Sequence, residues 1–297
     1  MSNSAQPPLF TCLMYPLRVR LVQKLNQKRF RNQISVPYIS QHFFRSLADI
    51  VISKNNIREL TGTLKLQKAR VIYCFSDVLK DFLESNQQIS SSLIFSGSTD
   101  LTIDYDLNAR LPNGVERIYV QNSKVSDNKR IFTLPIGLED LQLGLNGNTK
   151  YLMVKRTREK KCDKIMVGPF SQTHTERLEL LRSASISPKC CVYDRTLTPR
   201  QNAKASRLHR LVICPRGNGL DSHRLWETLY RGNIPILKSC SWSRSLGYLG
   251  VPMIFIQSWD PENLSALNAT QEPIVDSKSL PSLWAPYWNH LVASVYS

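Results

Sequence analysis

Long apolar runs are missing from this 297-residue sequence, and no segment approaches the roughly 18 apolar residues that could span a membrane. The one apolar stretch near the start, residues 9–17, has no basic residue before it and no small-residue cleavage site after it. We therefore expect no signal peptide. These absences predict a cytoplasmic protein that touches, at most, the inner face of a membrane.

Paired cysteines and the common nucleotide or nucleic-acid motifs are also missing. The seven cysteines are odd in number and show no C-x-x-C spacing, so we expect neither a disulfide framework nor a zinc site. No P-loop, zinc-finger, RNA-recognition or helix-turn-helix pattern occurs, which argues against a nucleic-acid partner. The loop Gly217-x-Gly219-x-x-Ser222 lacks the third glycine of the dinucleotide fingerprint, and no acidic residue lies about 20 positions on. An NAD-dependent enzyme is therefore disfavoured.

Acidic residues are absent before Asp49, whereas seven basic residues precede it, and the chain carries a formal net charge of +16. Leucines recur every four residues from Leu17 to Leu25, a spacing typical of a basic amphipathic helix. Further basic clusters lie at 150–164 and 189–210. This charge favours peripheral contact with an anionic membrane surface, and the alternative is a solvated basic face that only aids solubility.

Short apolar, β-branched runs alternate with helical patterns along the chain, and its 42% hydrophobic content can bury two ordinary cores. Strands are predicted near residues 49–53, 69–75, 92–95, 117–120, 131–134, 164–167, 190–193, 211–214, 234–237 and 253–256. The alternation predicts an α/β protein with parallel sheets. The polar, highly charged stretch 150–163 is a candidate linker. We therefore expect one domain at 1–150 and another at 151–297.

The stretch 211–237 contains a strand, a glycine-rich turn, a helix and a second strand, which together form one α/β unit. Asp221 or Ser222 can cap the helix, and Gly232 can end it. The turn at 215–219 places unpaired backbone N–H groups beside the positive end of that helix. Such a place favours a bound phosphate.

Arginines flank the phosphate-binding point of this unit, Arg216 in the turn and Arg224 in the first helical turn. Arg224 can instead form a surface salt bridge with Glu227, three residues on.

A second loop between a strand and a helix, at 168–177, brings His174 and Arg177 into the opening turn of its helix. At the carboxyl ends of neighbouring parallel strands, the two loops are expected to face one diphosphate. The alternative for Arg177 is an ion pair with Glu176 or Glu179.

The segments CPRG at 214–217, SHRLWETL at 222–229 and GNIPI at 232–236 resemble the C-terminal signature of exostosin-type glycosyltransferases. Weaker similarities to this family occur at 96–100, 119–122 and 134–139. The resemblance implies a GT-B fold, in which two Rossmann-like domains face a cleft, the second holds most of the nucleotide-sugar, and the last helix packs back on the first. It also implies an inverting hexosyl- or pentosyltransferase that uses a nucleotide-sugar donor, a glycan or lipid-linked glycan acceptor, and no required cofactor.

Inverting transfer needs a base for the acceptor hydroxyl, positive charge for the departing diphosphate, and contacts that hold the nucleotide. For the diphosphate we expect Arg216 and Arg224, assisted by the N–H groups near Gly217 and Ser222 and by the Ser222 hydroxyl. Glu227, one turn along the helix, is expected to accept hydrogen bonds from the ribose. The expected donor-binding set is Gly217, Ser222, His223, Arg224, Glu227, His174 and Arg177.

The base is expected to be Asp100, at a predicted strand end in the acceptor-side domain, and Asp77 and His223 compete for this role. Asp100 can instead be a loop aspartate that bonds its own backbone. The segment Asp104-Tyr105-Asp106 spells the D-x-D pattern that binds a metal in the other major glycosyltransferase fold. Because it lies far from the expected donor site, we predict no essential metal. The alternative function is a non-catalytic protein of the same fold that binds anionic partners through its basic face.

Overall fold

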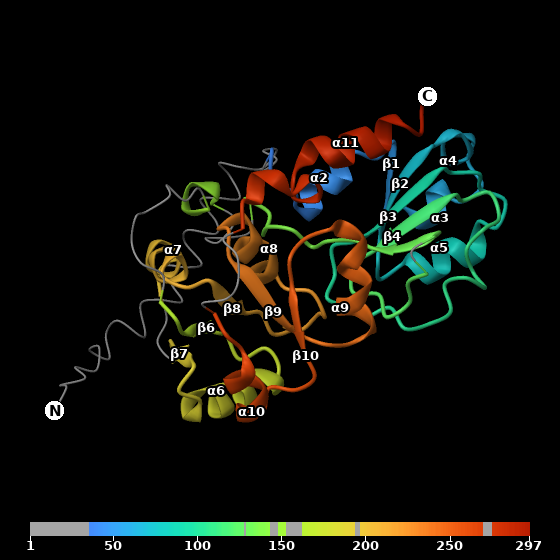
Figure 1. Cartoon of the computed structure of the whole chain (residues 1–297). Helices are drawn as coiled ribbons and strands as arrows, with labels where there is room; N and C mark the ends of the chain where they lie inside the picture. Colours follow the sequence, from blue (N-terminus) through green and yellow to red (C-terminus); the bar gives the residue numbers. More distant parts are fainter. Residues whose placement is uncertain (1–35, 128, 143–147, 153–161, 194–196, 270–274) are drawn as a thin grey trace, which may run out of the picture.

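The structure is a computed structural model that describes residues 36–127, 129–142, 148–152, 162–193, 197–269 and 275–297. It is a mixed α/β protein built on two parallel sheets of five strands each, as predicted (Figure 1). The arrangement is consistent with two Rossmann-like units, and the expected boundary near residue 150 falls between the two sheets in the sequence. The basic run with Leu17 to Leu25 and most of the expected linker lie outside the described residues.

The first sheet has its strands in chain order, so each connection crosses to the next neighbouring strand. The strands are β1 (Ile50–Ile52), β2 (Val71–Phe75), β3 (Leu93–Gly97), β4 (Arg117–Val120) and β5 (Ile131–Thr133). The short helices between them are α3 (Ile57–Leu60), α4 (Leu64–Lys68) and α5 (Leu79–Ser85). Because all five strands are parallel, their carboxyl ends meet at one edge of the sheet.

Both faces of this first sheet are covered, and the period-2 alternation of strand side chains assigns each residue to one face. Ile72 and Cys74 of β2 belong to a cluster with Leu79 and Phe82 of α5. Tyr73, between them, points to the other face and to a second cluster. On that face the sheet packs against α2 (Gln41–Ser46) and the C-terminal helix α11 (Ala285–Ala293).

The second sheet has the order β10-β9-β8-β6-β7, so the direction of strand addition reverses between β6 and β8. Its strands are β6 (Ile165–Val167), β7 (Cys190–Val192), β8 (Leu211–Ile213), β9 (Ile234–Lys238) and β10 (Ile254–Ile256). The helices on its two faces are α6 (Glu176–Ile186) and α10 (Pro261–Ala266) on one, and α7 (Pro199–Arg207) and α8 (His223–Tyr230) on the other. A reversal of this kind leaves a crevice at the carboxyl ends of the two central strands.

The C-terminal end of helix α8 lies where the sequence predicts, but its N-terminus lacks the predicted cap. Gly232, just beyond its last turn, has a φ of 72°, a left-handed conformation that glycine adopts without strain. The predicted side-chain cap is wrong, because Ser222 makes no capping hydrogen bond. The Asp221 carboxylate is instead occupied by the Ser222 N–H and by the indole of Trp226.

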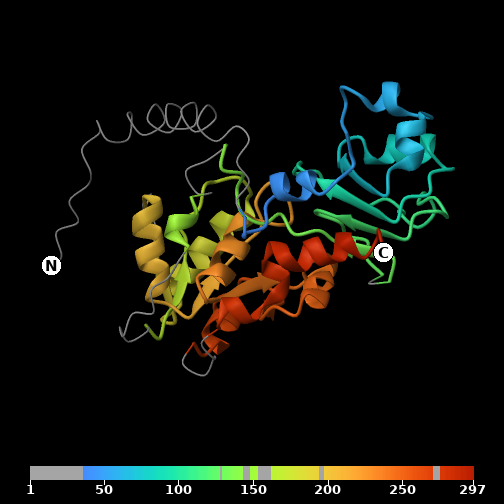
Figure 2. The ribbon, with the colours of Figure 1, turned by 90° about the horizontal axis from the view of Figure 1, so that it is seen from above.

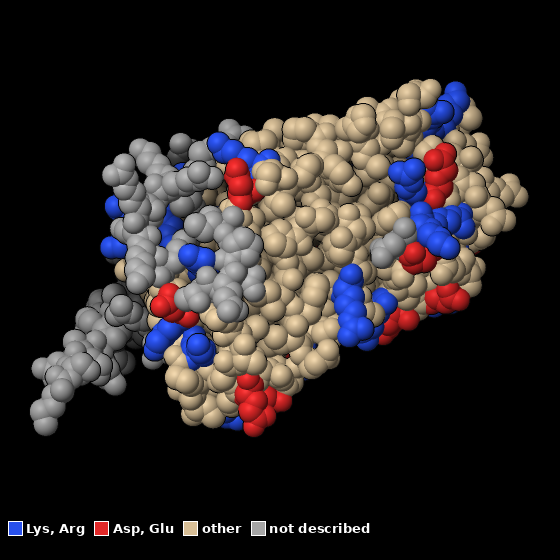
Figure 3. Space-filling view, viewed as in Figure 1, with Lys and Arg blue, Asp and Glu red and all other residues tan. Residues whose placement is uncertain are grey.

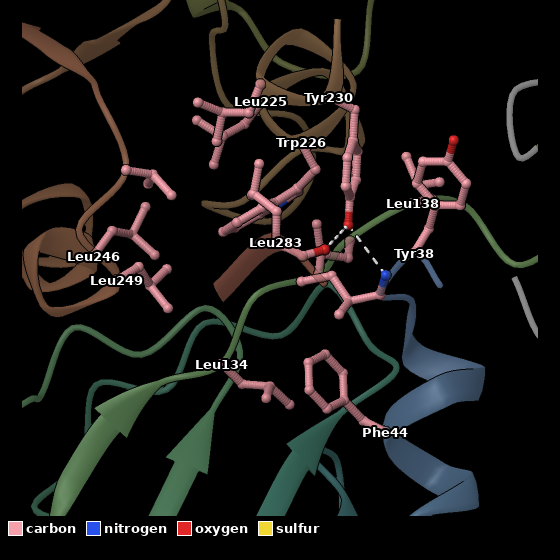
Figure 4. Packing of buried hydrophobic residues seen from close by; sticks show 14 of the residues in the cluster. Tyr38, Phe44, Leu134, Leu138, Leu225, Trp226, Tyr230, Leu246, Leu249 and Leu283 are labelled. Atoms are coloured by element: carbon pink, nitrogen blue, oxygen red, sulfur yellow. Dashed lines mark hydrogen bonds between the residues drawn. The ribbon is translucent and has the colours of Figure 1, made fainter. Parts of the chain in front are cut away.

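One apolar cluster joins the two sheets. Trp226 and Tyr230 of α8 pack toward Phe44 and Leu134 of the first half (Figure 4). The Tyr230 hydroxyl donates to the carbonyl of Leu283 and accepts from the N–H of Ile39 at 3.1 Å. These contacts fix the two halves against each other through a shared hydrophobic core.

The C-terminal segment runs back from the second half to the first, ending in α11 (red in Figure 2). Trp288 of α11 is fully buried, with its ring 5.0 Å from Phe44 and 5.6 Å from Tyr119, between ring centroids. Two 3₁₀ turns, η3 (Ser277–Ser279) and η4 (Pro281–Leu283), lead into it. Three further short elements complete the described structure: η1 (Thr149–Tyr151), α9 (Ser241–Ser245) and η2 (Leu246–Leu249).

None of the helices in the described ranges has both the length and the apolar composition needed to cross a membrane. Six of the cysteines fall within those ranges, and all six are free thiols.

Candidate functional site

The loops that follow β6 and β8 meet at the reversal point of the second sheet. Gly168 begins the first loop with a φ of 74°, and a Cβ there would lie 2.6 Å from the Tyr193 carbonyl oxygen, so the turn requires glycine. Arg177 of α6 reaches across to the second loop, where its Nε donates to the Arg216 carbonyl at 2.8 Å. The two loops expected to face one ligand are therefore in direct contact.

Two predicted phosphate-binding arginines lie against the same aromatic ring. The guanidinium carbon of Arg224 is 5.0 Å from the centroid of Phe170, and that of Arg177 is 5.7 Å from it. Arg224 also donates to the carbonyls of Gly168 and Pro169, at 3.3 and 2.6 Å. Burial lowers the pKa of both arginines, and for Arg177 the nearby Arg224 charge lowers the pKa further.

The expected alternatives for these arginines are wrong. Glu227 pairs with Arg231 and not with Arg224. Glu176 accepts a hydrogen bond from the Trp259 indole at 2.8 Å, and Arg177 bonds backbone carbonyls instead. Among the described residues, no carboxylate oxygen lies within 4.0 Å of the guanidinium nitrogens of Arg177, Arg216 or Arg224. The site therefore concentrates positive charge without a described counterion.

Arg216 folds over its own loop, with Nη2 3.0 Å from the Asn218 carbonyl oxygen and Nε 3.4 Å from that of Gly217. The backbone donors expected near Gly217 and Ser222 are already used. The Gly217 N–H bonds the Gly219 carbonyl at 3.1 Å, and the Ser222 N–H bonds the Asp221 carboxylate at 2.7 Å. An anion at this loop would therefore rely on the arginine side chains and on the first N–H groups of α8, which have no intrahelical acceptor.

His174 and Glu227, two more of the predicted donor-side residues, are placed differently. His174 precedes α6, and its Nδ1 accepts the Glu176 N–H at 3.2 Å, which leaves the ring beside the Arg177 turn. Glu227 is only 7% exposed, and its Oε2 lies 3.1 Å from Nη1 of Arg231, which is 8% exposed. Its carboxylate is thus committed to an internal ion pair, one turn beyond Arg224 on α8.

A pocket of about 290 Å³ lies at the carboxyl edge of the first sheet. Residues at the ends of β2, β3 and β4 line it, together with residues from α2, the segment after β5 and one from α8: Phe75, Ser98, Thr99, Asp100, Gln121, Gln41, Arg45, Ile136, Leu138, Asp140 and His223. Most of these groups are uncharged, and the Arg45–Asp140 ion pair at 2.7 Å balances two of the charges. Ser98 has a φ of 66°, a strained conformation for a serine that is often found at functional sites.

The predicted catalytic residues Asp100 and Arg216 are brought together through Asn218. The Asn218 side-chain amide donates to Asp100 at 3.2 Å. The backbone carbonyl of Asn218 accepts a hydrogen bond from the Arg216 guanidinium at 3.0 Å. Asp100 is exposed at the mouth of the pocket. Asp77, a competing base, is 3.0 Å from the Lys54 ammonium in an exposed ion pair and does not line the pocket.

Asp221 and Asn122 join the two halves, a role that was not predicted from the sequence. The Asp221 carboxylate accepts the Ile136 N–H at 2.8 Å, and the Asp221 N–H bonds the Asn122 side chain at 2.8 Å. Burial raises the pKa of Asp221 to about 7, although hydrogen bonds from Ile136, Trp226 and Ser222 lower it. Asn122 has a φ of 55°, which asparagine tolerates better than most residues. The only sequence feature that pointed to Asn122 was the weak family similarity at 119–122.

The D-x-D segment occupies a separate surface turn. Asp104 lies 3.8 Å from the Lys124 ammonium, and Asp106 accepts the Ala109 N–H at 3.1 Å. Across the part of the chain that the structure describes, no group of three His, Cys, Asp or Glu side chains is arranged to hold a metal ion.

Charged side chains are interspersed on the face shown in Figure 3. Lys and Arg lie mainly toward the two ends of the molecule, with Asp or Glu beside them, and an uncharged band runs between. The described residues on this face do not form one continuous basic surface. The N-terminal basic run, from which contact with an anionic membrane is expected, lies outside the described residues.

Comparison with known proteins adds no relative to this geometry: no protein-family profile matches the chain, and no curated protein sequence is significantly similar to it.

Proposed function

We propose that the protein is an inverting glycosyltransferase that transfers a sugar from a nucleotide-sugar to a glycan or lipid-linked glycan. The observation that carries this proposal is the position of Arg177, Arg216 and Arg224. These three arginines gather where the β6 and β8 loops meet, at the strand reversal where nucleotides bind in doubly wound sheets. They have no carboxylate partner among the described residues, so a diphosphate would supply the missing negative charge.

The second support for the proposal is the pocket on the first sheet, which lies next to the arginine cluster. Asn218 connects its loop to Asp100 at the mouth of the pocket on the first sheet. In this proposal the second half holds the donor, the pocket receives the acceptor, and the space between the two is the cleft of a GT-B fold. The arginines then stabilise the charge that develops on the leaving diphosphate, without a required metal.

The test is thermal unfolding with a panel of nucleoside diphosphates and nucleotide-sugars, with and without divalent metal. A ligand at about 100 times its Kd stabilises the folded state by roughly 2.7 kcal/mol, which raises Tm by several degrees. We expect a shift with one nucleoside diphosphate and its sugar, independent of metal. Absence of any shift, in protein shown to be folded, would contradict the proposal.

Arg216→Ala tests the site itself, because among the described residues the Arg216 side chain bonds only carbonyls of its own loop. Loss of charged hydrogen bonds worth about 1.5–3 kcal/mol should weaken donor binding by about 10- to 150-fold. Arg244→Ala is the matched control, because Arg244 is exposed on α9 and bonds the Ser239 hydroxyl. Equal donor affinity in the two variants would exclude the assigned role of Arg216.

The alternative is a protein of the same fold that binds anionic partners without transfer chemistry. The ion pair of Glu227 with Arg231 favours it, since a committed carboxylate is less free to bind a ribose. Nucleoside diphosphate binding without turnover of any nucleotide-sugar would support this alternative.

A further inference from the structure

His223 stands between the arginine cluster and the pocket. It is the first residue of α8 and the immediate neighbour of Arg224, yet it lines the pocket on the first sheet. The other residues that line this pocket come from the first half of the chain. His223 is therefore the side chain through which the proposed donor site reaches the proposed acceptor site.

The hydrogen bond of His223 to the first half defines its tautomer. Its Nδ1 lies 2.8 Å from the carbonyl oxygen of Gly137. A carbonyl oxygen can only accept, so Nδ1 carries the hydrogen. In the neutral ring Nε2 is then the unprotonated nitrogen, which is the state that a general base needs.

The two carboxylates of the pocket already have hydrogen-bond partners in the protein. Asp140 is held by the Arg45 guanidinium at 2.7 Å and by the His42 N–H at 2.8 Å. Asp100 is exposed and accepts the Asn218 amide at 3.2 Å. Both carboxylates therefore already accept hydrogen bonds from other groups of the protein.

The remaining polar groups of the pocket suit a hydroxyl-bearing molecule. Gln41 and Ser98 both bond the Tyr73 hydroxyl at 2.7 Å, and Gln121 accepts the Ser98 N–H at 3.0 Å. This network holds uncharged donors and acceptors in fixed positions at the carboxyl edge of the sheet. Such groups can orient a sugar hydroxyl without a charged partner.

We infer that His223 Nε2 is the general base that takes the proton of the acceptor hydroxyl, in place of Asp100. The hydroxyl oxygen then forms its bond to the anomeric carbon of the donor with its own electron pair. The bond from that carbon to the phosphate oxygen breaks, and its electron pair leaves on the nucleoside diphosphate beside Arg216 and Arg224. The imidazolium formed at His223 returns its proton to water. This inference rests on the proposed function.

The decisive variant is His223→Asn. An asparagine amide can occupy the place of Nδ1 and still donate to the Gly137 carbonyl, but it has no counterpart of Nε2. With the nucleotide-sugar that raises Tm in the panel, and with water or a series of methyl glycosides as acceptor, we expect kcat to fall by about 10²- to 10⁴-fold. We expect the donor Kd to change little. Asp100→Asn should lower kcat less than His223→Asn does, and His290→Asn, on the exposed side of α11, is the control that should keep full activity.

The outcomes separate this inference from the function on which it rests. If wild-type protein turns over no nucleotide-sugar, the proposed function fails and the base assignment fails with it. If wild type is active and His223→Asn is equally active, or if Asp100→Asn alone abolishes activity, the base assignment alone is wrong. The tautomer gives a readout that needs no substrate. In ¹⁵N NMR of the histidine rings, the signal missing from His223→Asn should show protonated Nδ1 and bare Nε2, and the opposite pattern would overturn the inference.

Discussion

The ion pair between Glu227 and Arg231 is buried, which makes it different from the exposed pairs of the surface. Its loss leaves a charge without compensation in a region of low dielectric. Removing one partner of a buried pair costs about 3–5 kcal/mol, whereas an exposed pair contributes about 0–1 kcal/mol. The carboxylate that the sequence assigns to a ribose is therefore also a structural group of α8.

We expect Glu227→Ala to lower the free energy of unfolding by about 3–5 kcal/mol, because Arg231 would be left buried and unpaired. Urea denaturation measures this value. Glu84→Ala is the matched control, since Glu84 is 47% exposed in its pair with Arg110, and its effect should stay below about 1 kcal/mol. Equal effects of the two substitutions would show that the buried position of Glu227 has no energetic consequence.

Asp221 should make the folded state less stable as pH rises, the opposite of what most carboxylates do. Its pKa is raised to about 7 by burial, against about 3.9 in an unfolded chain. Between these values the folded state holds a proton that the unfolded state has lost. The free energy of unfolding contributed by Asp221 therefore falls as pH rises from about 4 to about 7, and it is constant above that range.

Asp221→Asn isolates this contribution, because asparagine does not titrate. Denaturation at a series of pH values should show that the stability difference between wild type and variant shifts in favour of the variant as pH rises through this window. A difference that stays constant from pH 4 to 7 would contradict the raised pKa of Asp221.

The residue types of the candidate donor site could be predicted from the sequence, but their partners could not. The spacing of glycines, strands and helices placed Arg177 and Arg224 at neighbouring strand ends, where the structure has them around Phe170. Ion-pair partners depend on side-chain direction and burial, so the pairing of Glu227 with Arg231 rather than with Arg224 could not be predicted. Asp221 and Asn122 form contacts across the two halves, 99 positions apart in the chain, and no local pattern encodes such a contact.

At the scale of elements, the position of α11 depends mainly on one buried aromatic side chain, because the helix is short. Trp288 is fully buried among Phe44, Phe95 and Tyr119, and its indole N–H donates to the Ser282 carbonyl at 2.9 Å. The helix spans only Ala285–Ala293, too short to be stable alone in water. Its docking on the first sheet therefore depends on this side chain.

Trp288→Ala should lower the free energy of unfolding by about 3–5 kcal/mol, the usual cost of removing a fully buried large aromatic. Amide hydrogen exchange should also show faster exchange in α11 and in the facing residues of α2. His290→Ala, on the exposed side of the same helix, provides the comparison. Unchanged stability in Trp288→Ala would mean that α11 contributes little to the core.

All ten predicted strands occur in the structure. They could be predicted because buried parallel strands appear in a sequence as short apolar runs. The order of strands in each sheet is a different matter. Two runs of five parallel strands are compatible with several orders, and the reversal between β6 and β8 follows from packing of helices on both faces. The apolar pattern alone does not predict that order.

At the scale of the whole molecule, the two halves approach closely where Gly219 of the β8 loop faces Asn122. A Cβ on Gly219 would lie 2.6 Å from Nδ2 of Asn122 and 3.0 Å from its Oδ1. The Asn122 side chain cannot turn away freely, since it accepts the Asp221 N–H and donates to the Thr99 carbonyl at 3.2 Å. The close approach of the β8 loop to the first sheet therefore requires glycine at this position.

Gly219→Ala should push the β8 loop away from the first sheet and lower the free energy of unfolding by about 1–3 kcal/mol, the usual cost of overpacking. Gly247→Ala is the matched control, because a Cβ there meets nothing within 4 Å among the described residues. Since Asn218 and Arg216 belong to the displaced loop, Gly219→Ala should also weaken nucleoside diphosphate binding, measured by calorimetry. A variant that loses stability but keeps full affinity would show that the junction positions the two halves without positioning the arginines. A variant that keeps both would show that the junction has room to adjust.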